Sequence, residues 1–124
     1  MKIAGGRGMA IPEFTLRLVN RKLREYCEGR AHEALSHRVC LGWAVEGESV
    51  TLFEERRGLL DAATRVRLDT ARFRFDPRTG KWKLYYRGTG PAWHAYYLKP
   101  RADFETLLRE VDEDPVRVFG WGRG

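Results

Sequence analysis

The residues of this sequence best suited to acid–base chemistry are Glu55 and His94, which we expect on the same face of a sheet as Tyr85 and Arg87. A carboxylate and an imidazole can act as general base and general acid, and an arginine can hold an anionic substrate. Glu54 and Glu55 are adjacent on an expected strand, so their side chains point to opposite faces and do not form a paired-carboxylate site. We therefore rank catalysis through Glu55 and His94 third, after the two binding functions considered below, and we do not favour an enzyme.

Two histidines and a glutamate, His32, His37 and Glu33, lie close together in an expected loop. Their spacing matches no common zinc-binding pattern, and loop histidines are usually solvated. A glycine-rich segment, residues 88–90, is followed by a proline and an expected strand, whereas a nucleotide-binding loop leads into a helix. We therefore expect no metal site and no cofactor.

Basic and aromatic side chains alternate along the expected strands in the second half of the chain. Lysine and arginine can hold phosphates while tyrosine and histidine rings stack on bases, as in sheet proteins that bind single-stranded nucleic acid. A solvent-facing sheet surface is also polar when it binds nothing, and basic residues there oppose aggregation, so both interpretations stay open. When the last three expected strands are paired across their turns, no acidic residue lies opposite these side chains. The candidate nucleic-acid-binding residues are Arg72, Arg74, Lys83, Tyr85, Arg87, His94 and Tyr96.

The charge distribution favours an anionic partner. The chain contains 23 lysines and arginines and 17 aspartates and glutamates, which gives a formal net charge of +6. Residues 56–101 contain twelve basic and three acidic side chains, and residues 102–124 contain three basic and six acidic ones. A basic surface points first to a non-catalytic module that binds single-stranded nucleic acid or another polyanion. The alternative is a protein–protein interaction module that uses the acidic C-terminal helix and the aromatic tail after it.

The spacing of apolar residues predicts two amphipathic helices that position these groups. The first covers residues 13–28, Gly29 caps it, and residues 30–37 form a loop. The second begins at an N-cap, Asp103, and ends before Pro115. The apolar stripes are Leu16, Val19, Leu23 and Tyr26 or Cys27 in the first helix and Phe104, Leu107, Leu108 and Val111 in the second.

Alternating apolar residues and turn residues predict five strands between the helices. The strands cover residues 39–45, 50–55, 71–75, 81–87 and 93–98, and residues 57–70 are ambiguous. The apolar face of the sheet is expected to carry Trp43, Phe73, Phe75, Trp82, Leu84, Trp93 and Tyr97. The predicted fold is α+β: a helix, a five-stranded antiparallel meander and a second helix, with both helices on the apolar face.

The length of 124 residues suits a single domain, which we expect over residues 11–122 after a flexible lead at residues 1–10. We expect the natural start at either Met1 or Met9, and the sequence does not distinguish the two. Cys27 and Cys40 are too few for a disulfide framework, and we expect both to be reduced and buried. Neither a signal peptide nor a membrane span is evident, so the expected location is the cytoplasm.

Several segments together resemble a bacterial family known as domain of unknown function 3024. They are residues 49–56, residues 71–87, Trp93 and His94 with Tyr96, and Asp114 and Pro115 followed by residues 119–122. The resemblance covers roughly residues 11–122 and implies a compact single domain without implying an activity. The sequence departs from the family pattern at Gly88, where an aspartate is usual, and at Arg57, where a proline is usual. A glycine at position 88 weakens any catalytic role that needs a carboxylate in that turn.

Overall fold

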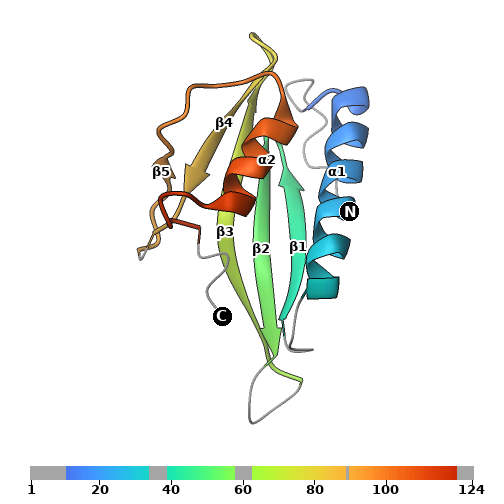
Figure 1. Ribbon diagram of the computed structural model, residues 1–124. Helices are drawn as coiled ribbons and strands as arrows, with labels where there is room; N and C mark the ends of the chain where they lie inside the picture. Colours follow the sequence, from blue (N-terminus) through green and yellow to red (C-terminus); the bar gives the residue numbers. More distant parts are fainter. Residues whose placement is uncertain (1–10, 34–38, 58–62, 89, 120–124) are drawn as a thin grey trace.

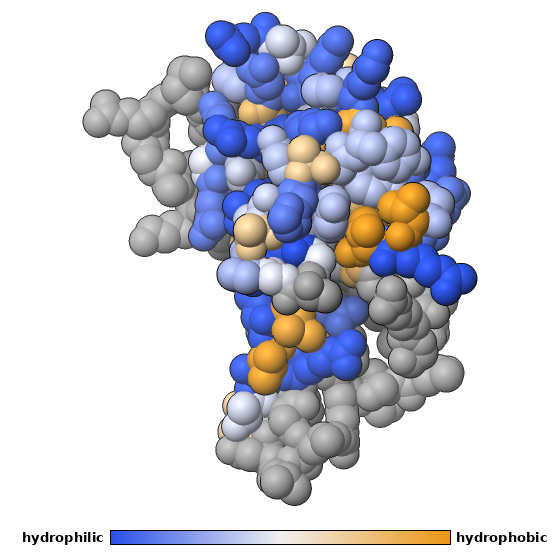
Figure 2. All heavy atoms as spheres, turned by 90° about the vertical axis from the view of Figure 1, so that its left-hand side faces the viewer, coloured by the Kyte–Doolittle hydropathy of each residue, from blue (hydrophilic) through white to orange (hydrophobic). Residues whose placement is uncertain are grey.

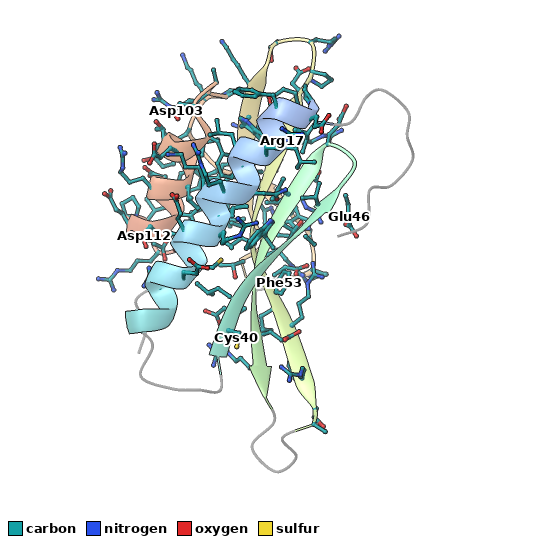
Figure 3. The ribbon with its side chains drawn as sticks, turned by 90° about the vertical axis from the view of Figure 1, so that its right-hand side faces the viewer. Arg17, Cys40, Glu46, Phe53, Asp103 and Asp112 are labelled. Atoms are coloured by element: carbon teal, nitrogen blue, oxygen red, sulfur yellow. The ribbon has the colours of Figure 1, made fainter. Side chains whose placement is uncertain are left out.

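The computed structural model describes residues 11–33, 39–57, 63–88 and 90–119, which form one antiparallel sheet and two helices (Figure 1). The strands lie side by side in chain order: β1 (Val39–Glu46), β2 (Ser49–Arg57), β3 (Arg65–Asp76), β4 (Lys81–Tyr86) and β5 (His94–Ala95). Helices α1 (Glu13–Glu33) and α2 (Phe104–Glu113) lie on one face of the sheet, as Figures 1 and 3 show. We call this the helix-side face and the other the open face. The predicted α+β class, the five-stranded meander and the position of the helices are confirmed.

Helix α1 is longer than the apolar pattern predicts. It begins after Pro12, whose carbonyl accepts a hydrogen bond from the Leu16 amide at 2.8 Å, and it continues past Gly29 to Glu33. A glycine inside a helix costs only about 1 kcal/mol relative to alanine, which tertiary contacts can offset. Arg30 provides such a contact, because its guanidinium lies 2.8 Å from the carboxylate of Asp112 on α2. Residues 30–33 are therefore helical, and the prediction of a loop there is wrong.

Helix α2 has the predicted N-cap and ends in a tight turn. The Asp103 carboxylate accepts hydrogen bonds from the Glu105 amide at 3.1 Å and from the Thr106 hydroxyl at 2.8 Å. At the other end Asp114 adopts a left-handed conformation with φ 47°, and its carboxylate accepts from the amides of Val118 and Phe119. These bonds turn the chain back toward the sheet and bury Phe119.

The core lies between the helix-side face and the helices. Trp82 is the largest fully buried side chain, and its ring is 4.9 Å from the Phe75 ring and 5.1 Å from the Phe104 ring of α2. Helix α1 docks on β1, where the Trp43 indole donates a hydrogen bond to Asn20 at 2.9 Å. Aromatic residues of β3, β4 and α2 thus make up the centre of the core, as the alternating pattern of the strands predicts.

A β-bulge divides the long strand β3. Leu52 pairs with Ala71 but Phe53 pairs with Asp69, so Thr70 is an extra residue on β3. A bulge of this kind reverses the alternation of side chains, which brings Asp69 to the open face beside Phe53. Residues 65–70, which the sequence left ambiguous, therefore continue the strand with its face pattern shifted.

Strand β5 contains two residues instead of the predicted six, and its two faces are exchanged relative to the prediction. Tyr86 pairs with His94 and Tyr85 pairs with Ala95, so His94 lies on the helix-side face and Ala95 on the open face. A shift of one residue exchanges the two faces of a strand. Placing Trp93 and Tyr97 in the core, and His94 and Tyr96 on the open face, was therefore wrong.

The observed environments of these residues follow from the corrected register. Trp93 lies on the open face against Arg72, and Tyr96 is buried on the helix-side face next to Phe119. Tyr97 stacks on Tyr96 but is 66% exposed. The Tyr96 amide still donates to the Leu84 carbonyl of β4 at 2.9 Å. The chain then leaves the sheet and returns at an isolated bridge between Trp82 and Arg101.

Both cysteines are free, but only Cys27 is partly buried. Cys40 is exposed because it pairs with Glu55 across β1 and β2 and shares the open face with it. The expectation that both cysteines are buried is therefore wrong for Cys40. Neither helix in the described part of the chain combines the length and apolar character that a membrane crossing requires.

Candidate functional site

Five of the seven predicted binding residues come together on the open face. Arg72 pairs with Tyr85, and Arg74 pairs with Lys83, in the antiparallel register of β3 and β4. Arg87 follows directly after β4, and its guanidinium carbon is 5.6 Å from the centre of the Trp93 ring on the same face. The β3–β4 hairpin has a short turn, so its register could be predicted from sequence.

A groove of about 700 Å³ lies where the tip of this hairpin meets the segment after β5. We call it the basic groove, because five cationic side chains and two carboxylates line it. The cations are Arg74, Arg78, Lys81, Lys83 and Lys99, and the carboxylates are Glu48 and Asp76. Tyr85 and Pro100 also line it. Figure 2 shows hydrophilic residues gathered over this end of the molecule.

Two lysines of the basic groove form no ion pair in the described part of the chain, although Asp76 lies opposite Lys81 in the register of β3 and β4. Arg74 lies 3.9 Å from Glu48, and Arg78 lies 3.8 Å from Asp76, and such long, exposed ion pairs contribute little. Within residues 11–33, 39–57, 63–88 and 90–119, neither Lys81 nor Lys99 forms an ion pair. An anion that enters the groove therefore meets positive charge that the protein has not neutralised.

Lys83 has a structural role in addition to its charge. Its ammonium group donates hydrogen bonds to the carbonyls of Tyr96 at 3.0 Å and Leu98 at 2.8 Å. These carbonyls belong to the segment that leaves the sheet after β5, so the sheet provides no ladder partner for them there. Lys83 thereby holds the segment that brings Lys99 to the groove.

Next to the groove, Trp93 lies between two arginines that other residues hold in place. The guanidinium carbon of Arg72 is 4.5 Å from the centre of the Trp93 ring, and its Nε donates to the Thr51 hydroxyl at 3.1 Å. Arg87 donates to Asp69 at 3.4 Å. Cation–π contacts of this kind contribute roughly 0.5–1 kcal/mol each at exposed sites, and here they fix the Trp93 ring.

Asp69 is an acidic residue of the open face that sequence reasoning did not place there. It accepts a hydrogen bond from Arg67 at 2.7 Å as well as the bond from Arg87. Arg67 also lies over the ring of Phe53, 4.2 Å from its centre, and Phe53 is labelled in Figure 3. Asp69 thus compensates two arginines of the open face.

The candidate catalytic residues do not share a site. Glu55 lies on the open face and forms an ion pair with Arg65 at 3.3 Å. His94 lies on the helix-side face, where its ring is 5.4 Å from that of Tyr86. Glu54 pairs with Arg56 at 2.9 Å on the face opposite to Glu55, as strand alternation predicts.

The candidate metal trio cannot be assembled from the described part of the chain. His32 and Glu33 belong to α1, and His37 lies outside the described residues. Where the structure describes the chain, no three side chains of histidine, cysteine, aspartate or glutamate are grouped closely enough to hold a metal ion.

A tyrosine–carboxylate cluster on the helix-side face has no clear sequence signal. The hydroxyl of Tyr96 donates to Glu110 at 2.7 Å, and the hydroxyl of Tyr97 lies 3.4 Å from the same oxygen. Burial and the neighbouring Glu110 carboxylate both raise the pKa of Tyr96, so its hydroxyl stays protonated. The cluster fastens the segment after β5 to α2 and thereby supports the position of the groove.

The acidic side chains of α2 are largely engaged within the molecule. Glu105 lies 3.4 Å from Lys22 of α1, and Asp112 lies 2.8 Å from Arg30. Phe119 of the aromatic tail is buried, and Trp121 lies outside the described residues. The described part of the surface that we considered for protein docking therefore serves mainly to join α2 to α1 and to the sheet.

Comparison with known proteins identifies a family and no activity. No curated protein and no solved structure matches the chain. The family described as Domain of unknown function (DUF3024) matches residues 11–122, which include both helices and all the strands described above. The chain therefore belongs to the family of domain of unknown function 3024.

Proposed function

We propose that this domain is a non-catalytic binding module that holds the phosphate backbone of a nucleic acid in the basic groove. The observation that carries the proposal is the convergence of cations from separate segments on one concave surface. Arg74 comes from β3, Lys81 and Lys83 from β4, and Lys99 from the segment after β5. Lysine and arginine contacts to phosphates supply most of the affinity of proteins for nucleic acids.

The arrangement along β4 suits a polymer better than a small anion. Lys81, Lys83 and Tyr85 line the groove, and Arg87 continues the same face beyond the end of the strand. Alternate residues of a strand are roughly 7 Å apart, so the open face presents basic or aromatic groups at regular intervals. A backbone with regularly spaced negative charges can follow such a row, whereas a single phosphate would use one end of it.

Protein docking is the second candidate function. Tyr97 is 66% exposed and Val116 is 49% exposed, and both lie near the C-terminal end of α2. Exposed apolar groups near an acidic helix are compatible with a protein partner. The basic groove favours the nucleic acid, because it gathers lysines that form no ion pair, whereas most carboxylates of α2 are engaged within the molecule.

We place the protein in the cytoplasm of a bacterium as part of this proposal. Its support is that Cys27 and Cys40 are both free, as expected in a reducing compartment. Catalysis stays the third possibility, and its support is weaker because Glu55 and His94 lie on opposite faces of the sheet.

The test is a binding titration with a charge-reversed groove. The variant carries Lys81→Glu and Lys99→Glu, and both positions are exposed. The matched control carries Arg21→Glu and Arg24→Glu on the exposed side of α1, which changes the net charge by the same amount. Fluorescence anisotropy of a labelled single-stranded 20-nucleotide DNA of mixed sequence, measured at several salt concentrations, gives the affinity and its salt dependence.

We expect wild-type affinity to fall with salt at a log–log slope of roughly −3, which corresponds to about four phosphates at about −0.7 each. The groove variant should lose most of the binding and about half of the slope, because two of the four contacts are removed. The α1 control should bind nearly as tightly as wild type. No binding at low salt, or an equal loss in both variants, would overturn the proposal.

A further inference from the structure

Among the described aromatic residues near β4 and β5, Tyr85 differs because its ring makes no ring contact and no cation–π contact. Tyr86, Tyr96 and Tyr97 contact neighbouring rings, and Trp93 contacts two guanidinium groups. Within the described part of the chain, the Tyr85 side chain makes neither a ring contact nor a hydrogen bond. It is only half-buried, on the open face at the edge of the basic groove.

The residue opposite Tyr85 leaves space beside its ring. The partner is Ala95, whose side chain is a single methyl group and is exposed. Directly opposed residues on antiparallel strands have Cβ atoms roughly 5 Å apart, and diagonal neighbours are about 7–8 Å apart. Trp93, two residues before Ala95, is therefore a diagonal neighbour of Tyr85. The surface above Ala95 is bounded by Tyr85 on one side and by Trp93 on another.

The Trp93 side of this space is ordered in the free protein. Arg72 and Arg87 contact the Trp93 ring, and they are held in turn by Thr51 and Asp69. The side chains on this side of the space are therefore held in place before a ligand binds, so binding costs less side-chain entropy. Arg72 and Arg87 act here as positioning residues for Trp93.

We infer that the space above Ala95 is a nucleobase site, in which one unpaired base stacks on Tyr85 while the adjoining phosphates occupy the basic groove. The inference rests on the proposed function and specifies its ligand as single-stranded nucleic acid. Bases inside a duplex have both ring faces covered by their neighbours, so only an unstacked base presents a face to a tyrosine. Base stacking on aromatic side chains tolerates any base, so the site selects single strands without selecting a sequence.

Two substitutions test the site without changing its charge. Ala95→Phe fills the space with a ring, and Tyr85→Leu removes the stacking surface but keeps an apolar side chain. Tyr85→Phe keeps the ring and serves as the conservative variant. Ala63→Phe adds the same ring to another exposed alanine, next to the start of β3 and away from the hairpin tip, and serves as the matched control for Ala95→Phe.

The probes are a labelled 12-nucleotide single-stranded DNA and the same sequence annealed into a duplex. We expect wild-type protein to bind the single strand at least about tenfold more tightly than the duplex. Ala95→Phe and Tyr85→Leu should each weaken single-strand binding by about 5- to 150-fold, the range for loss of one stacked base, and leave the salt slope unchanged. Tyr85→Phe and Ala63→Phe should behave as wild type.

The outcomes separate this inference from the proposed function. Equal affinity for single strand and duplex with a steep salt dependence, or unchanged binding in Ala95→Phe, would overturn the base site and leave the basic groove in place. Absence of binding to either probe at low salt would overturn both. The comparison of the two probes uses wild-type protein, so it is decisive even where a variant fails to fold.

Discussion

Replacing each of two tryptophans by alanine tests the assignment of sheet faces, because Trp82 and Trp93 lie on opposite sides of the sheet. Trp82 is 1% exposed and lies within 5.1 Å, ring centre to ring centre, of both Phe75 and Phe104. Removing a buried indole loses its transfer free energy and leaves a cavity, at a total cost of about 3–5 kcal/mol. A domain of this size is stable by about 5–15 kcal/mol, so Trp82→Ala should remove a large part of its stability.

Trp93→Ala should cost much less. The Trp93 ring is partly exposed on the open face, and its described contacts are the guanidinium groups of Arg72 and Arg87. Each such contact contributes roughly 0.5–1 kcal/mol, so we expect a loss of about 1–2 kcal/mol. The sequence pattern alone predicts the core for both tryptophans, and hence equal losses.

Urea denaturation followed by circular dichroism measures both effects, with the free energy of unfolding obtained by linear extrapolation. The reasoning would be refuted by losses of similar size, or by a loss under about 1 kcal/mol for Trp82→Ala. Where Trp82→Ala does not fold, Trp82→Phe supplies a milder version of the same comparison. It retains an aromatic ring and should still cost more than Trp93→Ala.

Three further predictions concern glycines and cysteines. A Cβ atom at Gly42 would lie 2.8 Å from the far end of the Phe53 ring, which would have to move aside. Gly29 lies in an open part of α1, so Gly29→Ala should stabilise the fold by about 0.5–1 kcal/mol, and Gly42→Ala should be less favourable than Gly29→Ala. Thermal unfolding compares the two variants. Burial raises the pKa of the Cys27 thiol to about 11, so a thiol reagent at pH 8 should modify the exposed Cys40 first. Mass spectrometry of the labelled protein identifies the modified cysteine. Rapid labelling of Cys27 would contradict this prediction. Because that pKa lies above the ordinary value of 9.0, the Cys27 contribution to stability should decline between about pH 9 and pH 11.

Local patterns were sufficient to predict the helices and the β3–β4 hairpin. The tight turn between Asp76 and Gly80 fixes which residues oppose each other, so Arg74 and Lys83 could be paired from sequence alone. The end of α1 depends instead on the contact between Arg30 and Asp112, which are far apart in the chain. No window of local sequence contains that information.

The error at β5 and the ambiguity in the first half of β3 have a common physical cause. Along a strand the identity of a face depends on parity, so one uncounted residue exchanges the two faces for every position beyond it. The extra residue Thr70 does this in β3, and the connection before Trp93 does it in β5. Neither position carries a sequence signal as strong as that of a tight hairpin turn.

The dependence of each strand face on the exact residue count also explains why only part of the candidate site could be predicted. Arg74, Lys83 and Tyr85 belong to the hairpin and follow from its register. Lys99 reaches the groove because the chain leaves the sheet after Tyr96 and is held there through the carbonyls that Lys83 binds. A charge reversal at Lys83 therefore removes a cation and also releases the segment that positions a second one. For this reason Lys81 and Lys99, and not Lys83, are the positions at which the charge of the groove can be changed without altering its shape.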